Sequence, residues 1–477
     1  MKKHTPALIL CILLFCVTGM FVVIAYISGL LPMQLLISGA AALVCLDLLS
    51  VVLAWNVRRK AFFAWGTVLA LLLMAVITVG SLGIGKLLGT AGNIMNVEVV
   101  STKVGVYVRA DDNAQSVSDT KGYSFGVLES IDRVNTDKAI SKLSADIGSS
   151  PKLGAYASPA DLVTALLDGE VDGVVLNSAY FDLLGDLDGF LDLDSRIRML
   201  GDARIDTIVQ KTEKNDGEVF TVFISGIDTR GPMIDNSRSD SNIIATVNTK
   251  THQVLLLSTP RDYFVPLSIS NGAKDKLTHA GIYGVSCCMD TLGMLYDIDI
   301  DYYFRVNFAG FENIIDSLGG ITVHSDYTFT SRGCSFVKGE NNVNGEQALV
   351  FARERYSFPD GDRQRGKDQM EVIKAVAKKA LSYDMLMNFS GVLDSMEGSF
   401  ETSVPYELLA SLVRSQLSTG GDWNFVSYSV NGYDDSQKPY SMGGLYAYVM
   451  QPDYDSVETA KQLMQQVRNG ETIQLPE

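Results

Sequence analysis

The chain has little of several residue types on which common enzymes depend. Its 477 residues include only four His, six Cys and three Trp. No Gly-x-Ser-x-Gly, His-Glu-x-x-His or Gly-x-x-x-x-Gly-Lys-Ser/Thr motif occurs, which argues against the common hydrolase, zinc-protease and P-loop classes. The cysteines lack the spacing of a zinc site. Any chemistry must therefore be sought among carboxylates and arginines.

Positive charge is also scarce and is unevenly distributed. The formal net charge is −16, although the mean hydropathy is +0.15. Residues 1–90 hold six Lys and Arg against one Asp, whereas the remainder carries a net charge of −21. An acidic body repels phosphate at long range, so the composition argues against a nucleic-acid binder. An anionic ligand would need a local basic cluster.

Three apolar runs, at residues 7–28, 33–55 and 61–85, are each long enough to cross a bilayer. Lys2 and Lys3 precede the first run, an Arg-Arg-Lys loop separates the second from the third, and the first link is uncharged. The positive-inside rule therefore predicts a multi-pass membrane protein with a cytoplasmic N-terminus and an extracytoplasmic body.

Asp47 lies within the second apolar run, where a carboxylate is costly in lipid. It is expected either to face the other helices or to lie near an interface, and its role stays open.

The body divides into two predicted α/β regions, after residues 1–90 with their three transmembrane helices. The first is an accessory domain at residues 95–212, without recognisable chemistry, and the polar stretch 211–217 predicts a linker. Its predicted strands are 97–100, 104–108, 124–127 and 173–176, and its predicted helices are 135–147 and 159–168.

The second region, residues 218–477, opens with three short strands at 219–224, 242–247 and 254–258. Their short connections predict an antiparallel meander, which would bring the charged residues of the strand ends to one sheet edge. These residues are Asp228, Arg230, Arg238, Asp240, Arg261 and Asp262.

Helical and strand patterns alternate after this meander, and they predict a central sheet flanked by helices. The predicted helices are 282–296, 309–318, 345–353 and 363–381, followed by three more, and the predicted strands are 302–308, 321–325 and 424–430.

The segment 351–369 gathers four Arg and one Lys in an otherwise acidic body. Arginine offers forked donors that match phosphate oxygens, and the start of the following helix also favours anions. Arg365 and Gln369 share the helix face that continues into Val372 and Val376, so they are expected to point along the buried side. The alternative is a solvated surface charge run.

Asp228 and Asp240 form a second group of candidate site residues. Mg²⁺ is commonly held by one or two carboxylates together with substrate phosphates and water, so this pair is a candidate metal site. Turn caps or salt-bridge partners of arginine are the equal alternative. His279 is a weaker candidate, because a capping or core histidine explains it equally well.

Cys287, Cys288 and Cys334 are predicted to lie outside the membrane. A disulfide from Cys334 to one member of the pair and three free thiols are both compatible with an oxidising compartment.

Residues 218–382 resemble the LytR-CpsA-Psr (LCP) family domain. The matching motifs, in chain order, are Ile224-Ser-Gly-Ile-Asp228, Arg238-Ser-Asp240-Ser, Ser258-Thr-Pro-Arg261-Asp262, Lys276-Leu-Thr-His-Ala280, Phe311 to Gly320, Ala352-Arg-Glu-Arg355 and Asp362-Arg-Gln-Arg365. The three spans and the middle region resemble the capsule-type (CpsA/Wzg-like) branch.

The resemblance implies a Mg²⁺-dependent phosphotransferase of a Gram-positive bacterium. Such an enzyme binds a polyprenyl-pyrophosphate-linked polysaccharide, transfers its sugar phosphate to peptidoglycan and releases polyprenyl phosphate. Asp228 and Asp240 would hold the metal, Arg261 with Asp262 or Asp240 would serve catalysis, and the remaining motif residues would bind substrate. These binding residues are Arg238, Arg261, Lys276, Arg353, Arg355, Arg365 and Gln369.

Some assignments stay open at this point. The resemblance leaves Arg363 and Arg365 as alternatives for one position, and the helix-face argument favours Arg365. A glycan pyrophosphatase and a non-catalytic regulator or scaffold of capsule export are the alternative functions.

Overall fold

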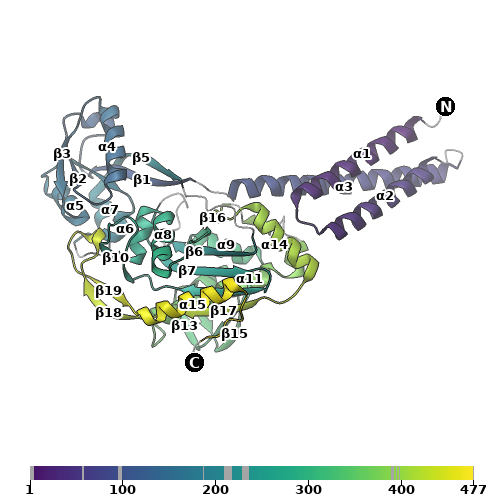
Figure 1. The fold of residues 1–477 in the computed structure, drawn as a ribbon. Coiled ribbons are helices and arrows are strands. Elements are labelled where there is room, and N and C mark those ends of the chain that lie inside the picture. The colour runs from purple at the N-terminus through teal and green to yellow at the C-terminus, as the bar shows by residue number, and fades with distance from the viewer. Residues whose placement is uncertain are drawn as a thin grey trace. The chain divides into compact units, whose positions relative to one another are not determined.

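The fold is described from a computed structural model. It describes residues 5–55, 59–94, 99–185, 187, 189–208, 217–227, 236–387, 392–393, 395–396 and 398–475. The chain divides into two compact units (Figure 1). One comprises Met1–Asn96, Val376–Gly398 and Val404–Asp422, and the other comprises Val97–Ala375, Ser399–Ser403 and Trp423–Glu477.

The first unit contains three long apolar helices, α1 (Thr5–Ser28), α2 (Met33–Trp55) and α3 (Lys60–Ile94). Their apolar parts are long enough to span a membrane, which confirms the three predicted spans. Gly66 lets α3 approach α2 closely, because a Cβ there would meet the backbone of α2. Asp47 is fully buried, so it faces the other helices rather than lipid.

The same unit includes two short helices from late in the chain, α12 (Tyr383–Met387) and α14 (Tyr406–Thr419). The Tyr406 hydroxyl donates a 2.9 Å hydrogen bond to the Ser28 carbonyl at the end of α1. A segment close to the end of the chain therefore contacts the first apolar helix.

The second unit contains two large sheets and several two-stranded ones. The first sheet has the order β3-β2-β4-β1-β5. Its strands are β1 (Val99–Arg109), β2 (Ser124–Leu128), β3 (Lys152–Tyr156), β4 (Gly173–Asn177) and β5 (Ile197–Ile208), with helices α4 (Arg133–Ile147), α5 (Pro159–Asp168), α6 (Tyr180–Leu184) and α7 (Leu193–Arg196).

The prediction of separate strands at 97–100 and 104–108 is wrong. One strand, β1, runs from residue 99 through 104–108, because it pairs along its whole length with β5 and accommodates a bulge between Val106 and Tyr107. Residues 97 and 98 of the predicted strand lie outside the described residues. Strand β5 escaped prediction because polar residues interrupt its apolar alternation.

The second sheet has the order β16-β11-β6-β7-β8-β17. Strands β6 (Val219–Ile227), β7 (Ser239–Asn248) and β8 (Gln253–Ser258) pair antiparallel, which confirms the predicted meander. Strand β11 (Tyr302–Val306) runs parallel to β6, and β17 (Asn424–Ser429) runs parallel to β8. Strand β16 (Phe400–Thr402) adds an antiparallel edge, so the sheet is mixed.

Helices cover both faces of this sheet. Helices α8 (Val285–Tyr296) and α15 (Tyr454–Asn469) pack with Phe223, Ile244 and Leu255 in the larger core (Figure 1). On the other face, Met370 of α11 (Asp362–Ala380) packs against Ile243, Ala245 and Leu256. The predicted α/β class, with three apolar helices and a mixed sheet flanked by helices, is confirmed.

Several helices and strands begin or end a few residues away from their predicted bounds, and two of these differences have a clear local cause. Phe308 is not a strand residue; it opens helix α9 (Phe308–Ser317), because Asn307 caps that helix by accepting from the Gly310 amide. A 3-10 helix, Leu277–Tyr283, precedes α8 and ends at Gly284, whose positive φ breaks the expected continuous helix.

Smaller elements complete the unit. They are the hairpin β9 (Phe264–Pro266) and β10 (Lys274–Lys276), β12 (Ile321–Ser325) with β15 (Gly339–Val343), β13 (Phe329–Ser331) with β14 (Cys334–Phe336), helix α10 (Gly345–Arg353), and β18 (Gly432–Gln437) with β19 (Ala447–Pro452).

All six cysteines lie within the described residues, and all six are free thiols. Burial raises the pKa of the Cys287 thiol to about 11, so it stays protonated near neutral pH. Of the two alternatives for Cys334, the structure therefore has the free thiol.

Candidate functional site

Charged side chains gather at the edge of the second sheet where β7 begins and β8 ends. Asp240 is the second residue of β7, and Arg261 follows β8 by three residues. The Thr259 amide donates to the Asn242 carbonyl at 2.9 Å, which continues the pairing beyond β8. The antiparallel meander thus brings together residues 21 positions apart in the chain.

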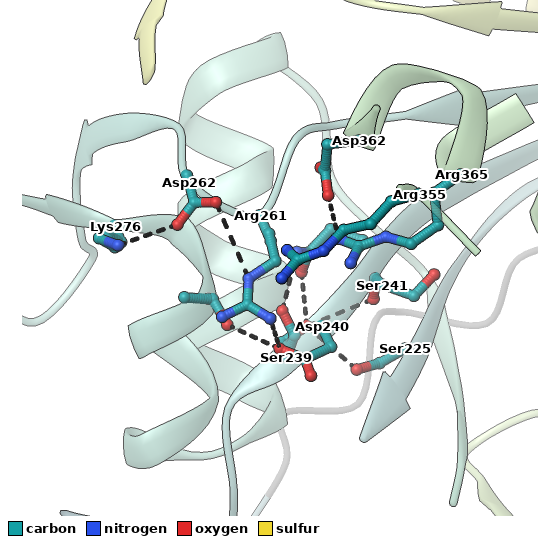
Figure 2. A network of polar contacts seen from close by, with 12 residues as sticks. Ser225, Ser239, Asp240, Ser241, Arg261, Asp262, Lys276, Arg355, Asp362 and Arg365 are labelled. Atoms are coloured by element: carbon teal, nitrogen blue, oxygen red, sulfur yellow. Dashed lines mark hydrogen bonds and ion pairs between the residues drawn. The ribbon is translucent and has the colours of Figure 1, made fainter. Parts of the chain in front are cut away.

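An ion-pair network joins these strand ends (Figure 2). The Arg261 guanidinium lies 2.6 Å from the Asp240 carboxylate and 3.9 Å from that of Asp262. The Lys276 ammonium lies 3.0 Å from Asp262. The exposed fraction of these four side chains is 15 to 21%, so they are neither fully buried nor freely solvated.

Lys276 reaches this edge because its strand, β10, pairs with β9, which follows Asp262 closely. The Thr278 amide donates to the Arg261 carbonyl at 2.8 Å, and the Thr278 hydroxyl lies 3.4 Å from the Asp240 carboxylate. Gly281 allows this segment to approach the chain before β7, because a Cβ there would lie 2.3 Å from the Ser237 carbonyl oxygen.

The first turns of α11 supply the next arginine. Arg365 pairs with Asp362 at 2.5 Å, and only 12% of its side chain is exposed. Burial lowers the pKa of Arg365, with Arg261 and Arg355 contributing repulsion, but a guanidinium stays charged near neutral pH. Arg363, by contrast, is exposed.

Helix α11 lies close to β8 at Gly366, where a Cβ would be 2.8 Å from the Ser258 hydroxyl. One helical turn from Arg365, the Gln369 carboxamide accepts from the Ser241 hydroxyl at 3.0 Å and donates to the Ala352 carbonyl at 3.3 Å. These contacts hold the buried face of α11 against β7.

Two further arginines lie at the end of α10: Arg353 is its last residue, and Arg355 follows two residues later. The Arg355 guanidinium lies next to that of Arg365 (Figure 2) and donates to the Tyr356 hydroxyl at 2.6 Å. Arg353 instead stacks over the Phe308 ring at 4.0 Å. Arg238 directly precedes β7, and its backbone lies against Gly281. Asp228 and Arg230 lie outside the described residues.

The charged groups border an open pocket of about 420 Å³. Its lining includes Asp240, Arg261, Arg363, Arg365, Gln369 and Met450. The structure thus brings together much of the predicted set, whose individual roles stay predictions. Among the described residues, no group of three or more His, Cys, Asp or Glu side chains could hold a metal ion.

Several residues that contact the site were not predicted from the sequence. Asp362 orients Arg365 through an i, i+3 pair, a spacing visible in the sequence. Thr278 lies inside the matching Lys276–Ala280 motif, but its contact with Asp240 depends on the tertiary fold. Met450 comes from β19 and carries no local signal. His279 is buried and bonded to Asp275 at 2.6 Å, which supports its reading as a core histidine.

Like charges crowd together at this edge, which is stable only if anions are interleaved with them. Asp240, Asp262 and Asp362 serve as those anions in the structure. A diphosphate could take their place, because guanidinium forks match phosphate oxygens. The arrangement therefore suits binding and charge neutralisation of a phosphorylated ligand.

Comparison with known proteins agrees with this chemistry. The LytR_cpsA_psr family model matches residues 198–463. The chain therefore belongs to the LytR-CpsA-Psr family.

Two relatives carry the name polyisoprenyl-teichoic acid–peptidoglycan teichoic acid transferase TagU. The protein from Enterococcus faecalis is 34% identical over 209 residues, which cover 43% of this chain and 69% of that protein. The protein from Bacillus subtilis is 34% identical over 213 residues, with the same coverage. Among solved structures, B. subtilis TagV has a TM-score of 0.46 and 26% identity, over 54% of this chain and all of that one.

Proposed function

We propose that this protein is a membrane-anchored glycopolymer–peptidoglycan phosphotransferase. It takes a polyprenyl-pyrophosphate-linked glycan, transfers the sugar phosphate to a peptidoglycan hydroxyl and releases polyprenyl phosphate. The observation that carries this proposal is the gathering of Arg261, Arg355, Arg365 and Lys276 at the sheet edge that holds Asp240 and Asp262, in a body of net negative charge. The names of the two TagU relatives support the same reaction class.

The arginines act by positioning and charge neutralisation, which dominate catalysis of phosphoryl transfer. Arg261 and Arg365 bind oxygens of the diphosphate, and Asp362 keeps Arg365 aimed at the pocket. The acceptor hydroxyl oxygen forms a bond to the phosphorus on the glycan side. The bridging P–O bond then breaks, and polyprenyl phosphate leaves with the bond electrons.

The proton of the acceptor hydroxyl goes to a carboxylate. Asp262 and Asp240 are the two candidates, as in the sequence analysis. Asp262 is held by Lys276 at 3.0 Å and Arg261 at 3.9 Å, whereas Asp240 is paired more closely with Arg261, at 2.6 Å. Asp262 is therefore the candidate whose carboxylate is less closely paired with a guanidinium, and we take it as the proton acceptor.

The proposed reaction implies a magnesium ion that is shared between protein carboxylates and the substrate phosphates, as in other enzymes that act on phosphates. Mg²⁺ is held by one or two carboxylates plus substrate phosphates and water, so a cluster of three protein ligands is unnecessary. Asp240 would hold the ion, with Asp228 as the second predicted ligand. When bound, the ion would add positive charge against the diphosphate oxygens.

The membrane arrangement follows the same proposal. The three apolar helices anchor the chain in the cell membrane, with the Arg-Arg-Lys loop in the cytoplasm and both sheets outside. Cysteine labelling from the outside tests this orientation. A cysteine introduced on β18 should react in intact cells, whereas one introduced in the loop should not.

The activity is tested with the full-length protein, a polyprenyl-pyrophosphate glycan and peptidoglycan. Arg261→Ala should reduce release of polyprenyl phosphate and formation of glycan-bearing peptidoglycan by roughly 10²–10³-fold, as for loss of one transition-state donor. The control is Arg196→Ala, which removes a surface arginine with 39% of its side chain exposed. Equal activity of the two variants would refute the site assignment.

Hydrolysis and transfer use the same pocket and differ in the acceptor. Omitting peptidoglycan distinguishes them: a phosphotransferase consumes donor slowly without acceptor, whereas a pyrophosphatase consumes it equally fast with or without peptidoglycan. Complementation of cells that lack the protein tests the scaffold alternative. If the protein acts only as a scaffold, the Asp240→Ala variant should restore full function to these cells. The expected polysaccharide is a capsule polymer, and identifying the lipid-linked glycan that copurifies with the protein would test this.

A further inference from the structure

The β18–β19 hairpin has one face exposed to solvent beside the candidate site. Asp434 is opposite Met450 and Ser436 is opposite Tyr448, so these four side chains share a face. Val449, on the other face, is fully buried, whereas Asp434, Ser436 and Tyr448 are exposed. Apart from the buried Met450, the side chains of this face are therefore open to solvent among the residues that the structure describes.

This exposed face runs directly into the pocket. The Met450 amide donates to the Asp262 carbonyl at 2.7 Å, and the Met450 side chain lines the pocket. Two residues along the strand, the Tyr448 ring lies 5.9 Å from the Lys276 ammonium. The face thus begins beside Asp262 and Lys276 and leads outward.

Tyr448 stands on this face, and Tyr446 directly precedes β19; both contribute little to the core. Tyr446 is 68% exposed and Tyr448 is 46% exposed. Tyr446 stacks with the Lys438 ammonium at 4.9 Å, and the Tyr448 hydroxyl donates to the Asp434 carboxylate at 2.7 Å. These contacts hold the rings in place in the absence of core packing, so the rings form a pre-oriented aromatic platform.

We propose that this face, from Met450 through Tyr448 to Tyr446, binds the sugar rings of the acceptor, a neutral peptidoglycan glycan strand. The proposal rests on the proposed function and adds the acceptor subsite to it. Tyr446 directly precedes β19 and is two residues from Tyr448, a separation of about 7 Å in extended chain, so the two rings can meet neighbouring sugars. The apolar faces of sugar rings pack on aromatic rings, while their hydroxyls bond to carboxylates and hydroxyls.

Charge and position favour the acceptor over the donor glycan. Residues 432–452 carry two Asp against one Lys, a net charge of −1, with Asp434 on the exposed face and Asp435 on the other. This charge does not attract a phosphate-bearing polymer and leaves the binding of a neutral sugar strand unaffected. The arginines that suit the diphosphate lie on the opposite side of Arg261 from Lys276 (Figure 2). An acceptor on the hairpin would approach from the Lys276 side and place its hydroxyl near Asp262.

The central test compares Tyr446→Ala with Tyr433→Ala. Tyr433 belongs to the same hairpin and is 64% exposed, but it lies on the other face. In transfer assays with soluble peptidoglycan oligosaccharides, Tyr446→Ala should raise the acceptor KM roughly tenfold, for loss of one stacked ring. The donor KM and the kcat should change less than about twofold. Tyr446→Trp should retain a low acceptor KM.

Tyr448→Phe tests the second tyrosine while keeping its aromatic ring. The acceptor KM should rise only a few-fold, because the ring remains and the hydroxyl contact with Asp434 is lost. An acceptor KM that is unchanged in a Tyr446→Ala/Tyr448→Ala double variant would overturn the proposal. So would an equal increase in Tyr433→Ala.

Direct binding separates this proposal from the proposed function. Calorimetric titration of the wild-type protein with the same oligosaccharides should show binding that the double variant loses and Tyr433→Ala keeps. If wild type transfers nothing but binds in this pattern, the proposed function fails and the subsite stands. If wild type transfers but the double variant binds as tightly as wild type, the subsite fails and the function stands.

Discussion

The two sheets of the second unit differ in where their charged residues lie. In the first sheet, the charged side chains stabilise turns and surfaces: Asp119 accepts from the Ser116 amide, and Arg196 pairs with Asp192 at 39 and 67% exposure. In the second sheet, Arg261 and Arg365 are 17 and 12% exposed and crowd around one edge. The two sheets are built from similar elements, yet within the described residues of these sheets the like charges concentrate at this edge.

This difference separates charged residues that stabilise the surface from charged residues whose arrangement is unfavourable for stability alone. An exposed pair such as Arg196 with Asp192 contributes about 0–1 kcal/mol and is dispensable. Arg365 loses hydration and experiences repulsion from Arg261 and Arg355, which is unfavourable for stability alone. Such an arrangement is typical of functional sites.

The sheets also meet through a buried polar contact. The Tyr180 hydroxyl, from the first sheet's side, lies 2.9 Å from that of Tyr283, which in turn lies 2.7 Å from the Ser441 hydroxyl. Ser441 also donates to Asp275 at 2.5 Å. The first sheet therefore packs against the segment that carries Lys276, although it supplies no charged group to the pocket.

The largest expected effect compares Arg365→Ala with Arg196→Ala. The first should lower kcat/KM for transfer by roughly 10²–10³-fold, because it removes a diphosphate donor. The second should leave it within about twofold. Steady-state rates of polyprenyl phosphate release measure both. A hundredfold loss in Arg196→Ala would mean that the two sheets do not differ in function.

A pH-dependent effect should come from Asp132, which directly precedes helix α4 beside the first sheet. Burial raises its pKa to about 6, although Asn177 and Asn135 donate to the carboxylate. Since the folded pKa lies above the unfolded value of about 3.8, stability is highest at low pH and falls as pH rises through about 6. The loss should reach at most about 3 kcal/mol.

Asp132→Asn removes this titration. Between pH 4 and pH 8, the free energy of unfolding of the variant should therefore fall by less than that of wild type. Chemical denaturation at several pH values measures the two slopes, so a constant offset between the proteins does not matter. Parallel curves would show that this carboxyl does not titrate differently in the folded state.

The contact between the sheets predicts a smaller effect. Tyr283→Phe leaves the buried hydroxyls of Tyr180 and Ser441 without this partner and should reduce the free energy of unfolding by about 1–2 kcal/mol. Thermal unfolding measures the change. Transfer activity at low temperature should stay near that of wild type, and a large loss of activity in folded protein would mean that the first sheet takes part in catalysis.

The smallest expected effect concerns Arg363. It lies two residues from Arg365 on α11 but is exposed, so Arg363→Ala should lower kcat/KM less than about fivefold. The same transfer assay compares it with Arg365→Ala. A larger loss in Arg363→Ala would reverse the choice between the two arginines that the helix-face argument made.

Local sequence signals predicted some elements well. The bounds 345–353 of α10 match because Asn344 and Gln347 form a capping box at its start. The bounds 159–168 of α5 match because Ser158 caps it and Gly169 ends it in a left-handed conformation. The meander β6–β8 was predictable because short connections allow only antiparallel neighbours.

Other elements lack any local signal. Strand β18 is largely polar, and it becomes a strand only by pairing with β19. Strand β5 is defined by its partner β1 in the same way. For the site, the sequence pointed to Arg261, Asp240 and Arg365, but the contributions of Thr278 and Met450 depend on contacts between distant segments.

By itself, the sequence determined the three apolar spans, the acidic body and the local excess of arginine, because length, hydropathy and charge are properties of the chain. Only the tertiary structure decided how the arginines are used. It brought Arg261 to Asp240 and Arg365 to the same edge, and it placed an exposed tyrosine face beside Asp262. Distances between segments arise from strand pairing and helix packing, which no local pattern specifies.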